Sequence, residues 1–97
     1  MNRYILAVDK SSNQTDEILA KYFNDNNIGY WHWIESFWLL ATDGKELDPN
    51  EFSKKVMDLI GERSVFVANI TGGVWSGKFA NVDESCNTWL KKYYTGV

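Results

Sequence analysis

The aromatic segment at residues 30–40, YWHWIESFWLL, constrains the fold of this chain more than any other feature. It holds three of the five tryptophans and the single histidine. Trp, Tyr and Phe favour the half-buried, pleated surface of a β-sheet. We therefore expect strands at 29–34 and 37–42, joined by a tight turn at 35–36. One long, bent strand over the same residues is the alternative.

Large rings should occupy both faces of these strands. Strict alternation places Tyr30, His32 and Ile34 on one face and Trp31 and Trp33 on the other. Because neither face is free of apolar rings, we expect both to be covered, which favours an oligomer. Stacking of the rings on a planar ligand is the functional alternative.

Apolar periodicity divides the rest of the chain into strands and helices. A strand is expected at 4–8, a helix after the polar turn at 11–15, a helix from 48 to 60, a strand at 64–71 and a last helix with an apolar stripe. This order is typical of the ferredoxin-like βαββαβ fold. We predict one α+β domain over 1–97, with a four-stranded antiparallel sheet, two helices on one face and an added C-terminal helix. The last helix, a second subunit or a ligand would cover the other face.

Charge and cysteine content exclude several classes of protein. The formal net charge of −3 disfavours broad binding to duplex nucleic acid, which needs clustered Lys and Arg. Cys86 is the only cysteine, so the chain forms no internal disulfide, and one Cys with one His falls short of a zinc site. No apolar run approaches the roughly 18 residues of a membrane span, and Asp9 follows too early for a signal peptide. We expect a cytoplasmic protein without a membrane partner.

A glycine-rich segment at 71–78, TGGVWSGK, follows the last expected strand. Its glycines let backbone N–H groups approach an anion closely, Lys78 adds positive charge, and Trp75 offers a ring for stacking. The spacing is not that of a P-loop. The alternative is a flexible connection in which Trp75 fills a contact between subunits.

Two further residues are candidates for catalysis. Asp9 ends the first expected strand, where it would hold a divalent cation together with Asp9 of a second subunit, or else form a turn and cap the following helix. His32 has the titration range of a general base, but between two tryptophans it is more typical of a packed strand residue.

Four segments carry a family resemblance: YILAVD at 4–9, WHWIESFWL at 31–39, FVANITG at 66–72 and WSG at 75–77. Together they resemble the SinR-like branch of small proteins related to the second core CRISPR-associated protein, the spacer-acquisition subunit. The resemblance implies a ferredoxin-like fold, a homodimer whose sheets face each other and, for nuclease-active relatives, a metal near Asp9. The chain departs from the pattern through the extra Gly73 and Val74 before Trp75, and through the lack of a second carboxylate close to Asp9.

Two functions remain in play. The first is a non-catalytic homodimer or higher oligomer that holds a nucleotide or nucleotide-derived small molecule at subunit boundaries without a cofactor, by analogy with viral or mobile-element proteins that sequester immune signals. The residues expected to bind this ligand are Trp31, Trp33, Trp38, Thr71, Gly72, Gly73, Trp75, Ser76, Gly77 and Lys78. The alternative is a metal-dependent endonuclease of the CRISPR-associated type, in which Asp9 from two subunits binds magnesium.

Overall fold

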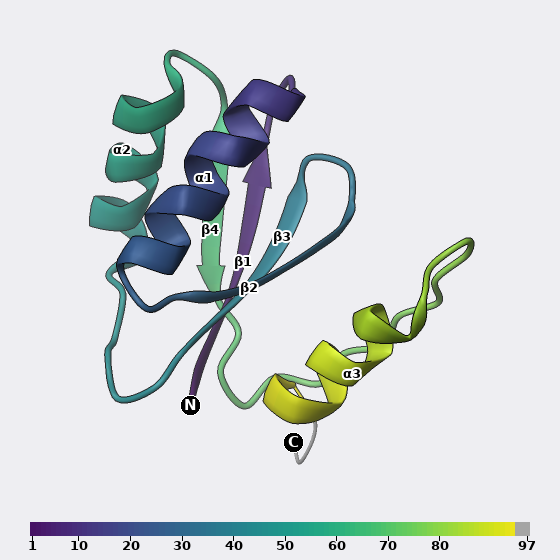
Figure 1. Cartoon of the computed structure of the whole chain (residues 1–97). Coiled ribbons are helices and arrows are strands. Elements are labelled where there is room, and N and C mark those ends of the chain that lie inside the picture. The colour runs from purple at the N-terminus through teal and green to yellow at the C-terminus, as the bar shows by residue number, and fades with distance from the viewer. Residues whose placement is uncertain (95–97) are drawn as a thin grey trace.

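A four-stranded antiparallel sheet with helices on both faces forms the protein, described here from a computed structural model for residues 1–94 (Figure 1). The elements are β1 (Asn2–Val8), α1 (Asn13–Asp25), β2 (Gly29–Ile34), β3 (Phe37–Thr42), α2 (Pro49–Ile60), β4 (Val65–Asn69) and α3 (Glu84–Tyr93). The strands lie in the order β2-β3-β1-β4. The predicted α+β class, the four-stranded antiparallel sheet and the C-terminal helix are confirmed.

The aromatic segment forms two strands, as predicted, and not one bent strand. Residues 35–36 make the turn between β2 and β3, and Ser36 adopts a positive φ of 62° there. A left-handed residue matches the turn to the right-handed twist of the strands on either side. The expected fourth strand was too long, because β4 ends at Asn69 and the Thr71 N–H already donates to the side chain of Asn69.

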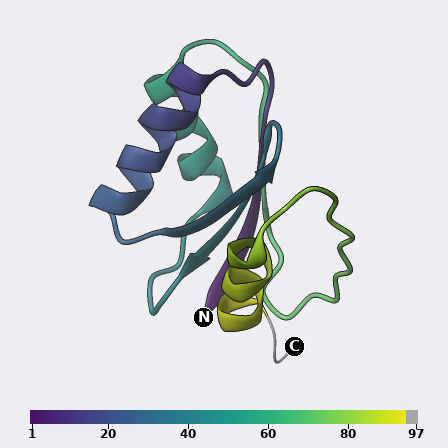
Figure 2. The ribbon, with the colours of Figure 1, turned by 45° about the vertical axis from the view of Figure 1, so that its right-hand side comes forward.

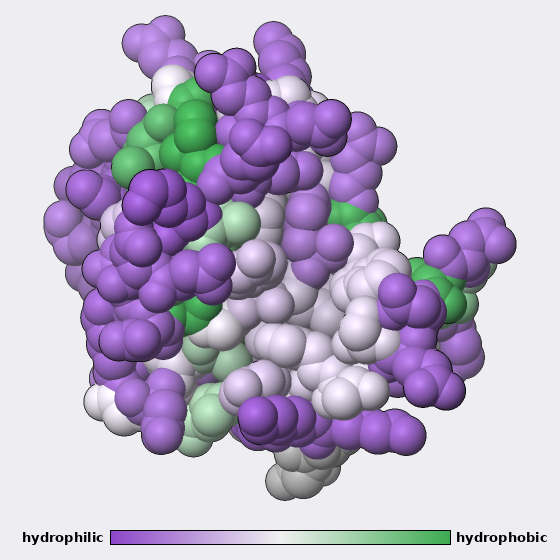
Figure 3. All heavy atoms as spheres, viewed as in Figure 1, coloured by the Kyte–Doolittle hydropathy of each residue, from purple (hydrophilic) through white to green (hydrophobic). Residues whose placement is uncertain are grey.

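Helices α1 and α2 cover one face of the sheet (Figure 2). Ser12 caps α1 in a capping box with Thr15, and Asp48 caps α2 just before Pro49. Their apolar stripes meet the sheet in the main core, whose largest members are Trp38, Tyr4, Phe23, Phe52, Leu6, Leu19 and Leu40. The outward sides of these helices are mostly hydrophilic and carry a small apolar patch (Figure 3), and Met57 of α2 is exposed.

Helix α3 packs on the opposite face, over β2 and β3, and covers only part of it (Figure 2). Asp83 caps α3, and Cys86, Leu90 and Tyr94 form its buried side. They make a second core cluster with Trp31 of β2 and with residues of β3. One of the three coverings predicted for this face is therefore supplied by the chain itself.

A bulge in β2 overturns the expected strict alternation. Trp31 pairs with Leu39, but the next recorded pair is Ile34 with Phe37, so β2 has one more residue than β3 over this stretch. The extra residue carries Ile34 onto the α3 side of the sheet, while His32 stays on the side of α1. The prediction that His32 and Ile34 share a face was wrong, because a bulge leaves no mark in the apolar pattern.

Within residues 1–94, the structure contains no helix that combines the length and the apolar character needed to cross a lipid bilayer.

Candidate functional site

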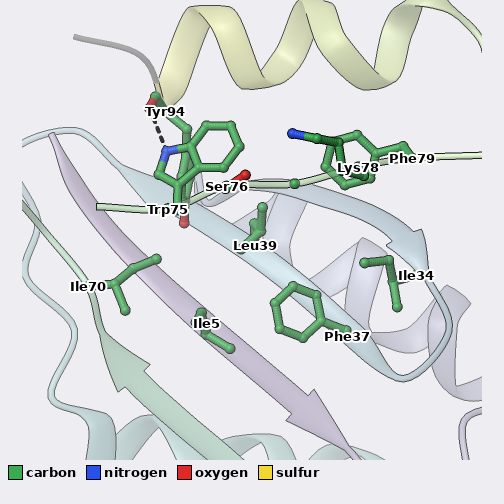
Figure 4. Close-up of a pocket in the computed structure, with 11 residues that line it drawn as sticks. Ile5, Ile34, Phe37, Leu39, Ile70, Trp75, Ser76, Lys78, Phe79 and Tyr94 are labelled. Carbon is green, nitrogen blue, oxygen red and sulfur yellow. Dashed lines mark hydrogen bonds between the residues drawn. The ribbon is translucent and has the colours of Figure 1, made fainter. Parts of the chain in front are cut away.

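The site with the best geometry for a ligand is a cavity of about 380 Å³ between the sheet and the glycine-rich segment (Figure 4). Side chains of β1, β2 and β3 form its floor, and residues 75–79 and the end of α3 form its wall. The lining residues are Ile5, Ile34, Phe37, Leu39, Ile70, Trp75, Ser76, Gly77, Lys78, Phe79 and Tyr94. The volume lies in the usual range for small-molecule sites.

Three hydrogen bonds join the glycine-rich segment and the end of α3 to each other and to β1. The indole N–H of Trp75 donates to the carbonyl oxygen of Tyr94 at 2.9 Å, drawn as a dashed line in Figure 4. At the start of the segment, the backbone N–H of Arg3 donates to the Thr71 hydroxyl at 2.9 Å. The guanidinium Nε of Arg3 also donates to the Tyr93 carbonyl at 2.7 Å. The loop and α3 are thereby joined to β1.

Tyr94 connects this wall to the sheet. Its hydroxyl lies 2.8 Å from the carbonyl oxygen of Leu40 and 2.9 Å from that of Tyr4, so one O–H is shared between two acceptors. Burial raises the pKa of the Tyr94 phenol, because a phenolate there would be cut off from water. The nearby Arg3 guanidinium acts in the opposite direction but is the smaller effect.

The pocket contains few polar side chains. Lys78 supplies the one formally charged side chain of the lining, and Ser76 supplies a hydroxyl (Figure 4). Within residues 1–94, the backbone N–H groups of 76, 77 and 78 donate to no other backbone group. These donors and the ammonium group suit an anion, whereas the apolar floor and the Trp75 ring suit a flat apolar body.

Gly77 packs closely against the ring of Phe79 inside the wall. A Cβ atom added at this position would lie 2.3 Å from Cζ of Phe79, well inside contact distance. The Phe79 ring is itself held against Trp31, with ring centroids 5.2 Å apart. The glycine therefore allows the loop to fold over Phe79, which is a structural reason for it besides the predicted anion contact.

Only part of the predicted ligand set lies together. Trp75, Ser76, Gly77 and Lys78 line the pocket, as a group that is contiguous in the sequence. Thr71, Gly72 and Gly73 precede the wall in a turn, where the Gly73 N–H donates to the Ile70 carbonyl and Gly72 has a positive φ of 78°.

The three tryptophans of the aromatic segment lie elsewhere. Trp31 is buried under α3 and donates its indole N–H to the Cys86 carbonyl at 3.2 Å. Trp38 is buried in the main core, and within the described chain its indole N–H has no acceptor. Trp33 is exposed at the bulge of β2, outside this pocket. Their rings are used for packing or lie on another surface, so none of the three lines this cavity.

Several lining residues were not identified from the sequence. Strand alternation would place Ile5, Phe37 and Leu39 on one sheet face, and that signal was available. Phe79 and Tyr94 carried no such signal, because they reach the pocket only through the path of the loop and the docking of α3.

His32 belongs to a separate polar cluster on the α1 side. Its Nε2 lies 3.2 Å from Asp16 Oδ2 and its Nδ1 lies 2.8 Å from the Phe37 carbonyl oxygen. Ser11 donates its hydroxyl to the other oxygen of Asp16 at 2.9 Å. The imidazole also stacks on Trp38, with ring centroids 3.8 Å apart and planes within 5°. Each ring nitrogen thus lies within hydrogen-bond distance of an oxygen atom, and the cluster links β2 to α1.

Asp9 is exposed at the end of β1, beside a hollow lined by Ser36, Ser64 and Phe66. The cap of α1 is Ser12, so Asp9 does not have the capping role that was one of its two expected roles. Among residues 1–94, no group of three or more His, Cys, Asp or Glu side chains is placed to hold a metal ion. A site built on Asp9 therefore needs ligands from a second chain.

Comparisons with known proteins assign no family and no function to the chain. No family model matches the chain, and no curated protein and no solved structure matches it either.

Proposed function

We propose that this chain is a non-catalytic binding protein that holds a nucleotide or nucleotide-derived small molecule in the pocket under residues 75–79. The observation that carries the proposal is Lys78, a cation at the rim of an otherwise apolar cavity that also presents the Trp75 ring. A ring stacks on an aromatic side chain with a gain of about 1–3 kcal/mol per base, and an ammonium group with free backbone N–H groups binds phosphate.

The absence of a catalytic role in this proposal is consistent with the lining residues. Among the described residues, the cavity wall contains no carboxylate, imidazole or thiol that would act as a general base or nucleophile. The phenol of Tyr94 is engaged with backbone carbonyls. Binding without turnover suits a protein that sequesters a signalling molecule, and by analogy we extend the proposal to a viral or mobile-element protein acting against host defence.

We further propose that the fold is ferredoxin-like and that the chain is of the SinR-like, CRISPR-associated-like type. The order β2-β3-β1-β4, with α1 and α2 on one face, supports the fold, and the four sequence segments support the resemblance. The type implies a homodimer. Exposed apolar surface on the part of the sheet that α3 leaves uncovered supports a second copy there: Phe66 is 65% exposed, and Ile5, Ala7 and Ala68 are half-buried beside it.

Native mass spectrometry of freshly purified protein tests the proposal first. We expect oligomers that carry a few hundred daltons of bound small molecule, and release of a compound with nucleotide absorbance on denaturation. Calorimetric titration with nucleotides follows, using Lys78→Ala and the matched control Lys45→Ala. Lys45 is an exposed lysine outside the pocket, so the control makes the same change in net charge. Absence of bound mass together with absence of nucleotide binding would overturn the proposal.

The alternative function is a magnesium-dependent endonuclease that uses Asp9 from two subunits. One observation favours keeping it: the Asp9 carboxylate is exposed and makes no hydrogen bond or ion pair within residues 1–94, so it is free to bind a cation. Cleavage that requires magnesium and is lost in Asp9→Asn, but retained in His32→Ala, would favour this function. Equal residual cleavage in Asp9→Asn would indicate a contaminating nuclease.

A further inference from the structure

Two aromatic residues of the pocket, Trp75 and Tyr94, carry a polar group, and both groups already form hydrogen bonds within the protein. The Trp75 N–H donates to the Tyr94 carbonyl, and the Tyr94 O–H is shared between the carbonyls of Tyr4 and Leu40. Trp75 is 37% exposed and therefore presents ring surface to a ligand without a free donor, whereas Tyr94 is buried behind it. A ligand that stacks on Trp75 is held by contact area and gains no hydrogen bond from its side chain.

The floor of the pocket contains no side chain that could form a hydrogen bond with the edge of a base. Ile5, Leu39 and Ile70 are apolar, and no Asn, Gln, Asp, Glu, His or Arg side chain from residues 1–94 lines the cavity. The remaining polar side-chain groups, Ser76 and Lys78, are two residues apart on the same loop (Figure 4). They form one small polar end of a pocket that is otherwise apolar.

A nucleobase carries several donors and acceptors on its Watson–Crick edge. Burying that edge against Ile5 or Leu39 would leave these groups without partners, which is unfavourable. The base must therefore lie flat with its edge toward the open mouth and the solvent. A site that makes no hydrogen bond to a group discriminates weakly for or against it, whereas a site built to pair with it discriminates strongly.

The charge of the pocket limits how many phosphate groups a ligand can carry. The one ammonium group of the pocket, in a chain of net charge −3, can pair with one phosphate group and provides no partner for a longer phosphate chain. No carboxylate lines the cavity among the described residues, so a phosphate-bridging magnesium ion would find no ligand there.

From these observations we infer that the pocket binds nucleoside monophosphates irrespective of the base, through one ring and one phosphate, and without a metal ion. This inference rests on the proposed function and narrows it. Ring stacking on Trp75 supplies the first contact. Lys78 and Ser76 supply the second, together with the N–H groups of 76–78, which donate to no other backbone group within residues 1–94.

Calorimetric titrations with AMP, GMP, CMP and UMP, in EDTA and then in magnesium, test the inference. The informative comparisons are AMP with GMP and CMP with UMP, because each pair has the same ring size and different edge groups. We expect affinities within about threefold in each pair, since nothing in the site pairs with the edge. Adenosine and ribose 5-phosphate, which each lack one of the two contacts, should bind at least about tenfold more weakly than AMP. ATP should bind no more tightly than AMP, and magnesium should change nothing.

Two lysine variants test whether Lys78 binds the phosphate. Lys78→Ala should lower AMP affinity to that of adenosine, and Lys45→Ala should leave it unchanged. A preference above about 30-fold within either pair, or a requirement for magnesium, would overturn the inference while leaving the proposed function standing. Failure of every nucleotide to bind, with no bound mass in native spectra, would remove the proposed function itself.

Discussion

The indole N–H of Trp75 donates to the backbone carbonyl of Tyr94 at 2.9 Å and joins the glycine-rich loop to the end of α3. Trp75 is still 37% exposed, so one residue both closes the wall of the pocket and offers a ring to it. A substitution that keeps an aromatic ring but removes the N–H separates the contribution of this hydrogen bond from that of the ring.

Trp75→Phe keeps an aromatic ring and removes the donor. We expect a protease to cleave within residues 72–79 faster, since a neutral hydrogen bond is worth about 0.5–1.5 kcal/mol and its loss lets the loop open more often. Limited proteolysis followed by mass spectrometry measures this directly. Trp33→Phe, at an exposed tryptophan outside the pocket, is the matched control and should not change cleavage within 72–79. Unchanged cleavage in Trp75→Phe would mean that the bond does not hold the loop.

Gly77→Ala should displace the Phe79 ring, because the new methyl group would lie 2.3 Å from Phe79 Cζ. The Phe79 ring then loses its place against Trp31, and the pocket loses part of its wall. We expect ligand affinity to fall at least about tenfold and the free energy of unfolding to fall by about 1–3 kcal/mol. Val74→Ala serves as the control, since Val74 is fully exposed in the same loop and should change neither quantity.

Tyr94→Phe should lower the free energy of unfolding at neutral pH by about 1–3 kcal/mol, because the Tyr4 and Leu40 carbonyls lose their shared donor. Chemical denaturation measures this change. Tyr22→Phe is the control, because no hydrogen bond of the Tyr22 hydroxyl is recorded in the described chain. An equal loss in both variants would show that the two carbonyl contacts contribute little.

The same residue predicts a dependence on alkaline pH. The pKa of Tyr94 is raised in the folded protein above its ordinary value of 10.0, so above that pH the unfolded chain releases this proton first. The stabilisation is complete below pH 10 and is lost progressively as the pH rises further toward the folded pKa. We expect wild-type protein to lose stability more steeply than Tyr94→Phe above pH 10, measured by urea unfolding at closely spaced pH values. Parallel curves for the two proteins would contradict the prediction.

Phe66→Ser should shift the proposed homodimer toward the monomer. Phe66 of β4 is 65% exposed on the same side of the sheet as its strand partner Ala7, so a second copy on this face would bury it. Sedimentation velocity over a range of concentrations measures the change, and circular dichroism should show an unchanged fold. Met57→Ser removes an exposed apolar residue from α2 and should leave the association intact. Equal association of both variants would exclude this face as the contact.

His32 and Asp16 should be energetically coupled. Their side chains lie 3.2 Å apart and are both partly buried, so they link β2 to α1. A double-mutant cycle of His32→Ala and Asp16→Ala, measured by urea unfolding, should give a coupling energy of about 0.5–2 kcal/mol. Strictly additive losses would mean that the stack of His32 on Trp38 does the stabilising and the carboxylate does not.

The sequence determined the elements of this protein and one contiguous part of its pocket. The helix expected from 48 to 60 matches α2, and the strands followed from apolar and aromatic runs, because capping and periodicity are local effects. The helix expected after the polar turn at 11–15 is present as α1, but it begins inside that turn at Asn13, since Ser12 is its cap. Residues 75–78 were identified as a ligand segment for the same reason: glycines, a hydroxyl and a lysine lie next to one another along the chain.

Only the tertiary structure decided which other residues share that pocket. The bulge in β2 moved Ile34 to the pocket face, and the docking of α3 brought Tyr94 within reach of Trp75 across 18 intervening residues of loop and helix. Packing also took Trp31 and Trp38 into two separate cores, although the sequence had grouped them with Trp33 as ligand residues. Such choices depend on which surfaces meet after the sheet forms, and contacts between distant residues have no counterpart in a local pattern.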